Sequence, residues 1–156
     1  MKKSFLVMML AIAGIWSASA QVDGNAIGLR LGWGGEISYQ HALGSANRLE
    51  MDLGLSLGSE HFAMGLTGIY QWVFDLSALA KGFNWYVGPG ATAAFWSYKD
   101  DNIKSAFALG VVGQIGIEYN FDIPLQLSLD YRPAFLILPS TGFGWSDVAL
   151  GIRYKF

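Results

Sequence analysis

Residues 145–156, at the end of the chain, read W-S-D-V-A-L-G-I-R-Y-K-F, and this stretch decides the fold. Every second residue counted back from the end is apolar, which gives the row Val148, Leu150, Ile152, Tyr154 and Phe156. The residues between them are charged or small, namely Asp147, Ala149, Gly151, Arg153 and Lys155. Because successive side chains of a strand point to opposite faces, this alternation predicts a β-strand with one apolar and one polar face.

The same alternation recurs in earlier segments of the chain. They are residues 25–33, 36–40, 48–58, 62–75, 82–96, 107–121 and 125–132. Turn residues such as Gly34-Gly35 separate them, Pro89 predicts a local bulge or kink, and Pro133 breaks the alternation of its segment. With the last strand, the pattern predicts an all-β fold, an eight-stranded antiparallel up-and-down transmembrane β-barrel.

The first twenty residues have the anatomy of a secretory signal peptide. Lys2 and Lys3 precede an apolar run from Phe5 to Ile15, and residues 18–20, Ala-Ser-Ala, suit a signal peptidase. The run is too short to cross a bilayer as a helix of about twenty residues. We therefore expect a signal peptide at 1–20 and a barrel domain at 21–156. The absence of cysteine excludes a lipoprotein anchor at the cleavage site and any disulfide.

Composition agrees with a strand-built membrane protein. Hydrophobic residues make up 53% of the chain, yet past residue 20 there is no apolar run long enough for a transmembrane helix. Loss of the signal removes two of the ten basic residues and none of the twelve acidic ones, so the formal charge changes from −2 to −4. This acidic balance argues against nucleic acid as a partner.

The charged residues of the polar rows indicate which face of the barrel is inside. A soluble barrel would turn its apolar rows inward around a ligand, whereas a membrane barrel turns them toward lipid. The polar rows mix both charge signs with glycine and alanine, so we expect the charges to pair inside. The predicted interior network is Arg30, Glu36, Arg48, Glu50, Asp52, Glu118, Asp130, Arg132, Asp147, Arg153 and Lys155.

Aromatic residues are predicted to form two belts, as at the interfaces of a membrane. One belt comprises Tyr39, Trp72, Phe74, Phe83, Trp85, Tyr119, Phe121, Tyr154 and Phe156. The other comprises Trp33, Phe62, Phe95 and Phe107. A soluble barrel has no reason to show both belts, so the membrane barrel is the favoured interpretation.

With these features residues 21–156 resemble the small eight-stranded outer-membrane barrels of Gram-negative bacteria, of the OmpA/OmpX type. The terminal Y-K-F carries the resemblance best, and the segments G-I-Y-Q-W and G-F-N-W-Y-V-G-P-G-A look like those of Bacteroidota barrels. The resemblance implies an outer-membrane location, outer-membrane lipid and lipopolysaccharide as surroundings, and periplasmic chaperones during biogenesis. It also implies that Val148, Leu150, Ile152, Tyr154 and Phe156 form the signal for the barrel-assembly machinery. Short loops disfavour a role as an adhesin.

Catalysis is not expected from this sequence. The only histidines are His41 and His61, and although Ser59 and Glu60 are near His61, neighbouring strand residues face opposite ways. No metal-ligand spacing, phosphate loop or dinucleotide motif is present, so we expect no cofactor. The charged loop from Lys99 to Lys104 is expected to be solvated, with contact to lipopolysaccharide phosphates as an alternative.

The sequence thus predicts a monomeric, non-enzymatic membrane protein with a structural or surface role. Eight strands leave an interior that side chains just fill, so a charge-paired, largely closed interior is favoured over an open channel. Two other functions stay open, a narrow passive pore and a lipid A modifying enzyme.

Overall fold

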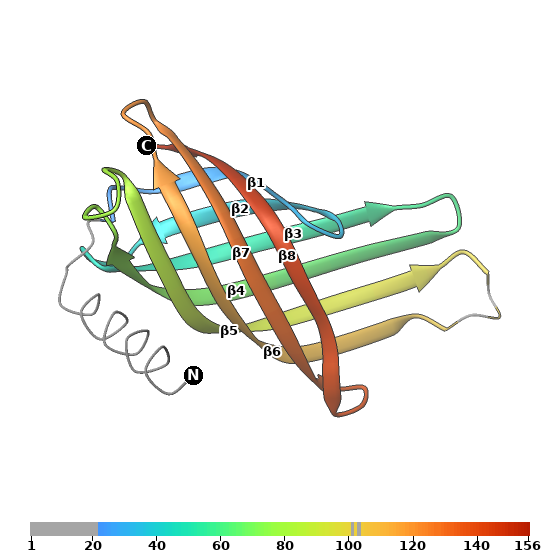
Figure 1. The fold of residues 1–156 in the computed structure, drawn as a ribbon. Helices are drawn as coiled ribbons and strands as arrows, with labels where there is room; N and C mark the ends of the chain where they lie inside the picture. The colour runs from blue at the N-terminus through green and yellow to red at the C-terminus, as the bar shows by residue number, and fades with distance from the viewer. Residues whose placement is uncertain (1–21, 101, 103) are drawn as a thin grey trace, which may run out of the picture.

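The computed structural model describes residues 22–100, 102 and 104–156, which form a closed barrel of eight strands (Figure 1). The predicted signal peptide and its cleavage site lie outside the described residues. The strands are β1 (Ala26–Leu31), β2 (Gly35–Ala42), β3 (Asn47–Leu57), β4 (His61–Asp75), β5 (Phe83–Tyr98), β6 (Ala106–Asn120), β7 (Leu125–Leu138) and β8 (Gly142–Lys155).

Each strand pairs antiparallel with its neighbours in the sequence, and β1 closes the barrel by pairing with β8. The pair Ala26 and Lys155 places the start of β1 beside the end of β8, and we call this the terminal end. The opposite end, which carries the β1–β2, β3–β4, β5–β6 and β7–β8 connections, is called the distal end. The prediction of an all-β, eight-stranded up-and-down barrel is confirmed.

Strand lengths make the distal rim uneven. β1 has 6 residues and β2 has 8, whereas β4, β5 and β6 have 15, 16 and 15. Figure 1 shows the β3–β4 and β5–β6 hairpins extending well beyond the β1–β2 hairpin. At the seam between β1 and β8, the last residue of β1, Leu31, pairs with Leu150. Residues 142–149 of β8 therefore have no partner on β1. The distal rim is therefore low at β1 and β2.

Two prolines behave differently from the sequence prediction. β7 continues past Pro133 to Leu138, because a register shift between Pro133 and Phe135 accommodates the ring in the pairing with β8. At Pro89 the predicted bulge is absent from the β4–β5 pairing. The register of Ile69 with Gly90 equals that of Trp72 with Val87, and only the pairs between them are missing. A proline without a donor interrupts the ladder here and does not displace it.

The two faces of the sheet differ as the alternation predicts. On β8, Leu150 is 45% exposed on the outer face, while its neighbour Ala149 is 2% exposed on the inner face. Two apolar residues of β4, Ile69 and Val73, break the rule and lie inside. They form small inner clusters with Val112 and Tyr86.

Aromatic rings of the predicted first belt contact one another around the terminal end. Phe74 stacks on Trp85 with centroids 4.5 Å apart, and Tyr119 meets Phe121 edge-on at 4.6 Å. Tyr154 stacks on Phe156 at 6.5 Å. At the distal end, Phe135 and Phe143 form an edge-on pair. The outer surface is thus apolar between two aromatic rims.

Candidate functional site

The barrel interior holds an ion-pair network built on arginines of β1, β3, β7 and β8. These are Arg30, Arg48, Arg132 and Arg153, none more than 3% exposed. Their partners are Glu36, Glu50, Asp52, Glu118, Asp130 and Asp147. Buried charges are tolerated only when they are paired and hydrogen-bonded, and this arrangement meets that condition from several strands at once.

Arg30 organises the distal part of the network. Its Nη2 lies 2.6 Å from Asp130 Oδ1, and its Nη1 lies 2.9 Å from Glu36 Oε2 and 2.8 Å from Asp147 Oδ2. One guanidinium therefore ties β1 to β2, β7 and β8. Its planar fork of donors suits such multiple pairing better than a lysine ammonium would.

Glu50 lies at the centre, where it is fully buried. Its Oε2 accepts hydrogen bonds from Arg153 Nη2 at 3.0 Å and Gln40 Nε2 at 2.7 Å. Its Oε1 accepts from Gln114 Nε2 at 3.0 Å and from Arg132 Nη2 at 3.3 Å. Arg132 also pairs with Asp52 and Glu36, so Glu50 joins the distal groups to the middle of the barrel.

Arg48 continues the network toward the terminal end. Its Nη2 lies 2.6 Å from Glu118 Oε2, and its guanidinium carbon lies 5.0 Å from the centre of the Tyr86 ring. Arg48 Nε donates to Gln71, Gln71 donates to Gln114, and Gln114 donates to Glu50. Polar contacts therefore run without a break from Asp147 to Glu118.

The central groups of the network are buried: Arg30 and Arg153 are 1% exposed and Glu50 is 0% exposed. Glu50 lines neither the cavity at the distal end nor the cavities at the terminal end. Within the described residues, the buried ion pairs thus lie between the distal and the terminal cavities.

Glycine on β6 makes room for one large side chain of this network. A Cβ at Gly116 would lie 2.5 Å from the hydroxyl oxygen of Tyr86, which in turn donates a hydrogen bond to Asp130 Oδ2 at 3.3 Å. Tyr86 is completely buried. The inner face therefore alternates small and large residues so that an aromatic ring fits into a narrow lumen.

The structure places the predicted interior charges together, with one exception. Lys155 lies at the terminal end beside Asp23 and Asn120, half-buried, and has no ion pair among the described residues. Lys155 lines a small cavity together with Arg48 and Glu118, and its place in the network stays a prediction. The predicted assembly residues Val148, Leu150, Ile152, Tyr154 and Phe156 all lie exposed on the outer side of the last strand.

Neutral members of the network were missed by the sequence analysis. Gln71 and Gln114 together link Arg48 to Glu50, Gln40 donates to Glu50, and Tyr86 packs against Arg48. Their positions on the polar rows were visible in the sequence. Their roles depend on contacts across the lumen, which the alternation does not specify.

The two histidines lie at opposite ends of the barrel. His61 begins β4 at the distal rim, exposed, and its ring lies 6.5 Å from that of Tyr98. His41 contacts the hydroxyl of Tyr39 at 3.4 Å at the other end. No hydrogen bond joins either ring to a serine or a carboxylate within residues 22–100, 102 and 104–156.

The described residues contain no group of three or more His, Cys, Asp or Glu side chains placed to hold a metal ion. No helix among them has the length and apolar character needed to cross a membrane.

Solved structures share this fold at low sequence identity. The N-terminal β-barrel domain of Pseudomonas aeruginosa OprF matches with a TM-score of 0.65 and 12% identity, covering 85% of this chain and 95% of that chain. Neisserial surface protein A (NspA) matches with a TM-score of 0.61 and 16% identity, covering 85% of this chain and 93% of that chain. No protein-family model and no curated protein matches the sequence. The chain therefore has the fold of these small eight-stranded barrels.

Proposed function

We propose that this chain is a monomeric integral protein of the bacterial outer membrane with a structural or surface role. The apolar outer face supports this proposal, because leucine, isoleucine, valine and aromatic side chains lie exposed on every strand. In water such a surface would be an aggregation liability, whereas in lipid it is the required exterior. The similarity in fold to OprF and NspA supports the same environment.

The terminal end is assigned to the periplasm and the distal end to the outside of the cell. Lipid and lipopolysaccharide would surround the outer face between the aromatic rims. During biogenesis, periplasmic chaperones and the barrel-assembly machinery would act on the chain, with the outer row of β8 as the signal.

The observation that carries the closed, non-conducting function is the buried centre of the network. Arg132 and Arg153 converge on Glu50 from opposite ends of its carboxylate, and none of the three is more than 3% exposed. A water-filled path would have to displace these pairs, and removing a partner from a buried ion pair costs about 3–5 kcal/mol. A passive pore is therefore disfavoured relative to a plug of paired side chains.

Conductance across planar bilayers tests this proposal. The protein is first extracted in detergent from the membrane fraction, and faster migration of the unboiled sample on a gel establishes a closed barrel. Reconstituted protein, whose incorporation is checked by vesicle flotation, should then give no discrete current steps. Reproducible single-channel steps from the wild type would reject the plug in favour of a narrow pore.

The absence of enzymatic activity is part of the same proposal. A lipid A modifying enzyme would need a histidine with a serine and a carboxylate at the outer rim, and His61 is turned toward Tyr98. Mass spectrometry of lipid A from cells with and without the protein checks this. A mass change that depends on His61 would overturn it.

A further inference from the structure

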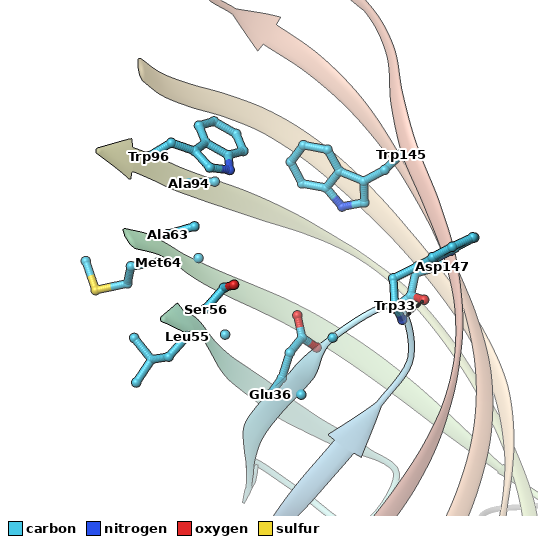
Figure 2. Close-up of a pocket in the computed structure, with 14 residues that line it drawn as sticks. Trp33, Glu36, Leu55, Ser56, Ala63, Met64, Ala94, Trp96, Trp145 and Asp147 are labelled. Carbon is cyan, nitrogen blue, oxygen red and sulfur yellow. Dashed lines mark hydrogen bonds between the residues drawn. The ribbon is translucent and has the colours of Figure 1, made fainter. Parts of the chain in front are cut away.

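The distal end of the barrel contains a cavity of about 300 Å³ that the closed interior does not explain. We call it the distal cup and define it by the walls Ala63, Ala94, Trp96 and Trp145 and the floor Glu36 and Asp147. Figure 2 shows both indole rings on one side of this space, with the Glu36 carboxylate directed toward it from another side. The cup lies above Arg30 and Arg132, so it is separate from the buried centre.

Large aromatic side chains on an inner face are unusual in this barrel. Trp96 and Trp145 belong to the polar rows of β5 and β8, where, Tyr86 apart, most other positions carry charged, polar or small residues. Trp145 is 39% exposed, and Trp33, at the low lip formed by the β1–β2 connection, is 91% exposed. Beside Trp96, the small side chains of Ala63 and Ala94 leave the space open. The cup thus offers indole surface to a ligand and covers it with no side chain of its own.

The floor of the cup has a negative charge balance. Glu36 and Asp147 have side chains 24% and 14% exposed, and Arg30 and Arg132 pair with them from below. The same two arginines also pair with Asp52 and Asp130. Two positive charges therefore lie against the four negative charges of Glu36, Asp147, Asp52 and Asp130. Glu50, which Arg132 shares with Arg153, is not included in this count. No lysine or arginine lines the cup among the described residues.

We propose that the distal cup binds a small organic cation with an apolar or aromatic body, such as a substituted ammonium compound. Indole faces attract ammonium groups through their quadrupole, and the two carboxylates add a favourable charge. The volume suits a single small ligand. Anions, including phosphate groups, meet the wrong sign of charge. On the side of β1 and β2 the barrel rim is low, because these strands have only 6 and 8 residues.

The experiment uses benzyltrimethylammonium as the probe and the full-length protein in dodecyl maltoside, a detergent without charge or ammonium groups. Binding is followed through the indole N–H resonances of ¹⁵N-labelled protein and through nuclear Overhauser contacts from the probe's methyl groups. Phenylmethanesulfonate is the anionic control, and neopentylbenzene is the uncharged control of the same shape.

We expect saturable binding of the cation, with shifts confined to Trp33, Trp96 and Trp145. Trp96→Leu or Trp145→Leu should each weaken binding about tenfold, the loss of one strong cation–π contact. Trp72→Leu is the matched control, because Trp72 lies on the outer face near the terminal end, and it should leave the affinity unchanged. Ala63→Phe fills the cup beside Trp96, its partner across β4 and β5, and should abolish binding while both indoles are kept.

Three results would overturn the proposal. They are the absence of saturable shifts, equal binding of the sulfonate and the ammonium probe, and an unchanged affinity in Ala63→Phe. Each variant is checked for heat-modifiable migration first, and Ala63→Phe decides the matter where an indole variant does not fold. The result does not depend on whether the barrel conducts, since the cup lies on the distal side of the central Glu50 and its arginines.

Discussion

Replacing Arg132 by methionine tests whether the buried network holds the barrel together. Arg132 is 3% exposed and donates to Glu36 Oε2 at 3.1 Å, to Glu50 Oε1 at 3.3 Å and to Asp52 Oδ2. Glu36 would keep Arg30, and Glu50 would keep Arg153. Asp52 would keep no arginine within ion-pair distance in the described residues, so it carries most of the expected cost.

Loss of one partner from a buried ion pair costs about 3–5 kcal/mol. Because two of the three carboxylates retain another arginine, we expect the lower end, about 3 kcal/mol, for Arg132→Met. Adding Asp52→Asn removes the stranded charge, and the double variant should recover at least about 1 kcal/mol of this loss.

The assay is reversible urea unfolding in phospholipid vesicles, followed by tryptophan fluorescence and by heat-modifiable migration. Both variants and the wild type are compared in the same lipid. If the free energy of unfolding of Arg132→Met lies within about 1 kcal/mol of the wild-type value, the buried ion pairs of Arg132 do not stabilise the barrel as argued. Failure of Asp52→Asn to restore any stability would refute the assignment of the cost to Asp52.

Three further changes test the outer face, the assembly signal and the packing of the lumen. Leu150→Arg places a charge on the lipid side and should destabilise the barrel by about 2–4 kcal/mol in vesicles, and an unchanged unfolding curve would contradict that facing. Deletion of Phe156 should slow assembly in cells, measured by pulse-chase, while folding into synthetic vesicles proceeds; equal loss in both settings would count against a machinery signal. Gly116→Ala should cost about 1–3 kcal/mol because its Cβ would meet Tyr86. Gly68→Ala, which has no neighbour within 4 Å, is its control and should change unfolding little.

The alternation of β8 and β6 allowed the fold to be predicted, because a period of two leaves only one way to separate apolar from polar residues. Strand ends were less predictable. β7 runs on through Pro133 because a register shift against β8 compensates for the ring, and that shift depends on the partner strand. Likewise, Pro89 loses its pairing on one side only, since Gly113 of β6 still pairs with it on the other.

Individual contacts of the interior were beyond a prediction from the sequence. Parity along each strand puts Arg30 and Asp130 on the inner face, but their ion pair joins residues 100 positions apart. Which charges meet depends on the closure of β1 onto β8 and on the stagger of every pair between them. Lys155 has the right parity and lines a small cavity with Arg48 and Glu118, yet no ion pair joins it to them among the described residues.

Turning the apolar residues outward changes what makes the interior specific. In a soluble domain, packed aliphatic side chains define the core, and many apolar substitutions are tolerated if the volume is kept. Here the core positions are filled by Arg30, Glu50, Gln71 and Arg153. Each of these side chains needs a particular partner in a particular orientation, in addition to the right volume. A wrong neighbour would leave a buried charge unpaired, which costs more than a small void. The same logic explains the distal cup, because the network ends at Glu36 and Asp147 with more acid than base, and the indoles above them face a space that only a cation would fill favourably.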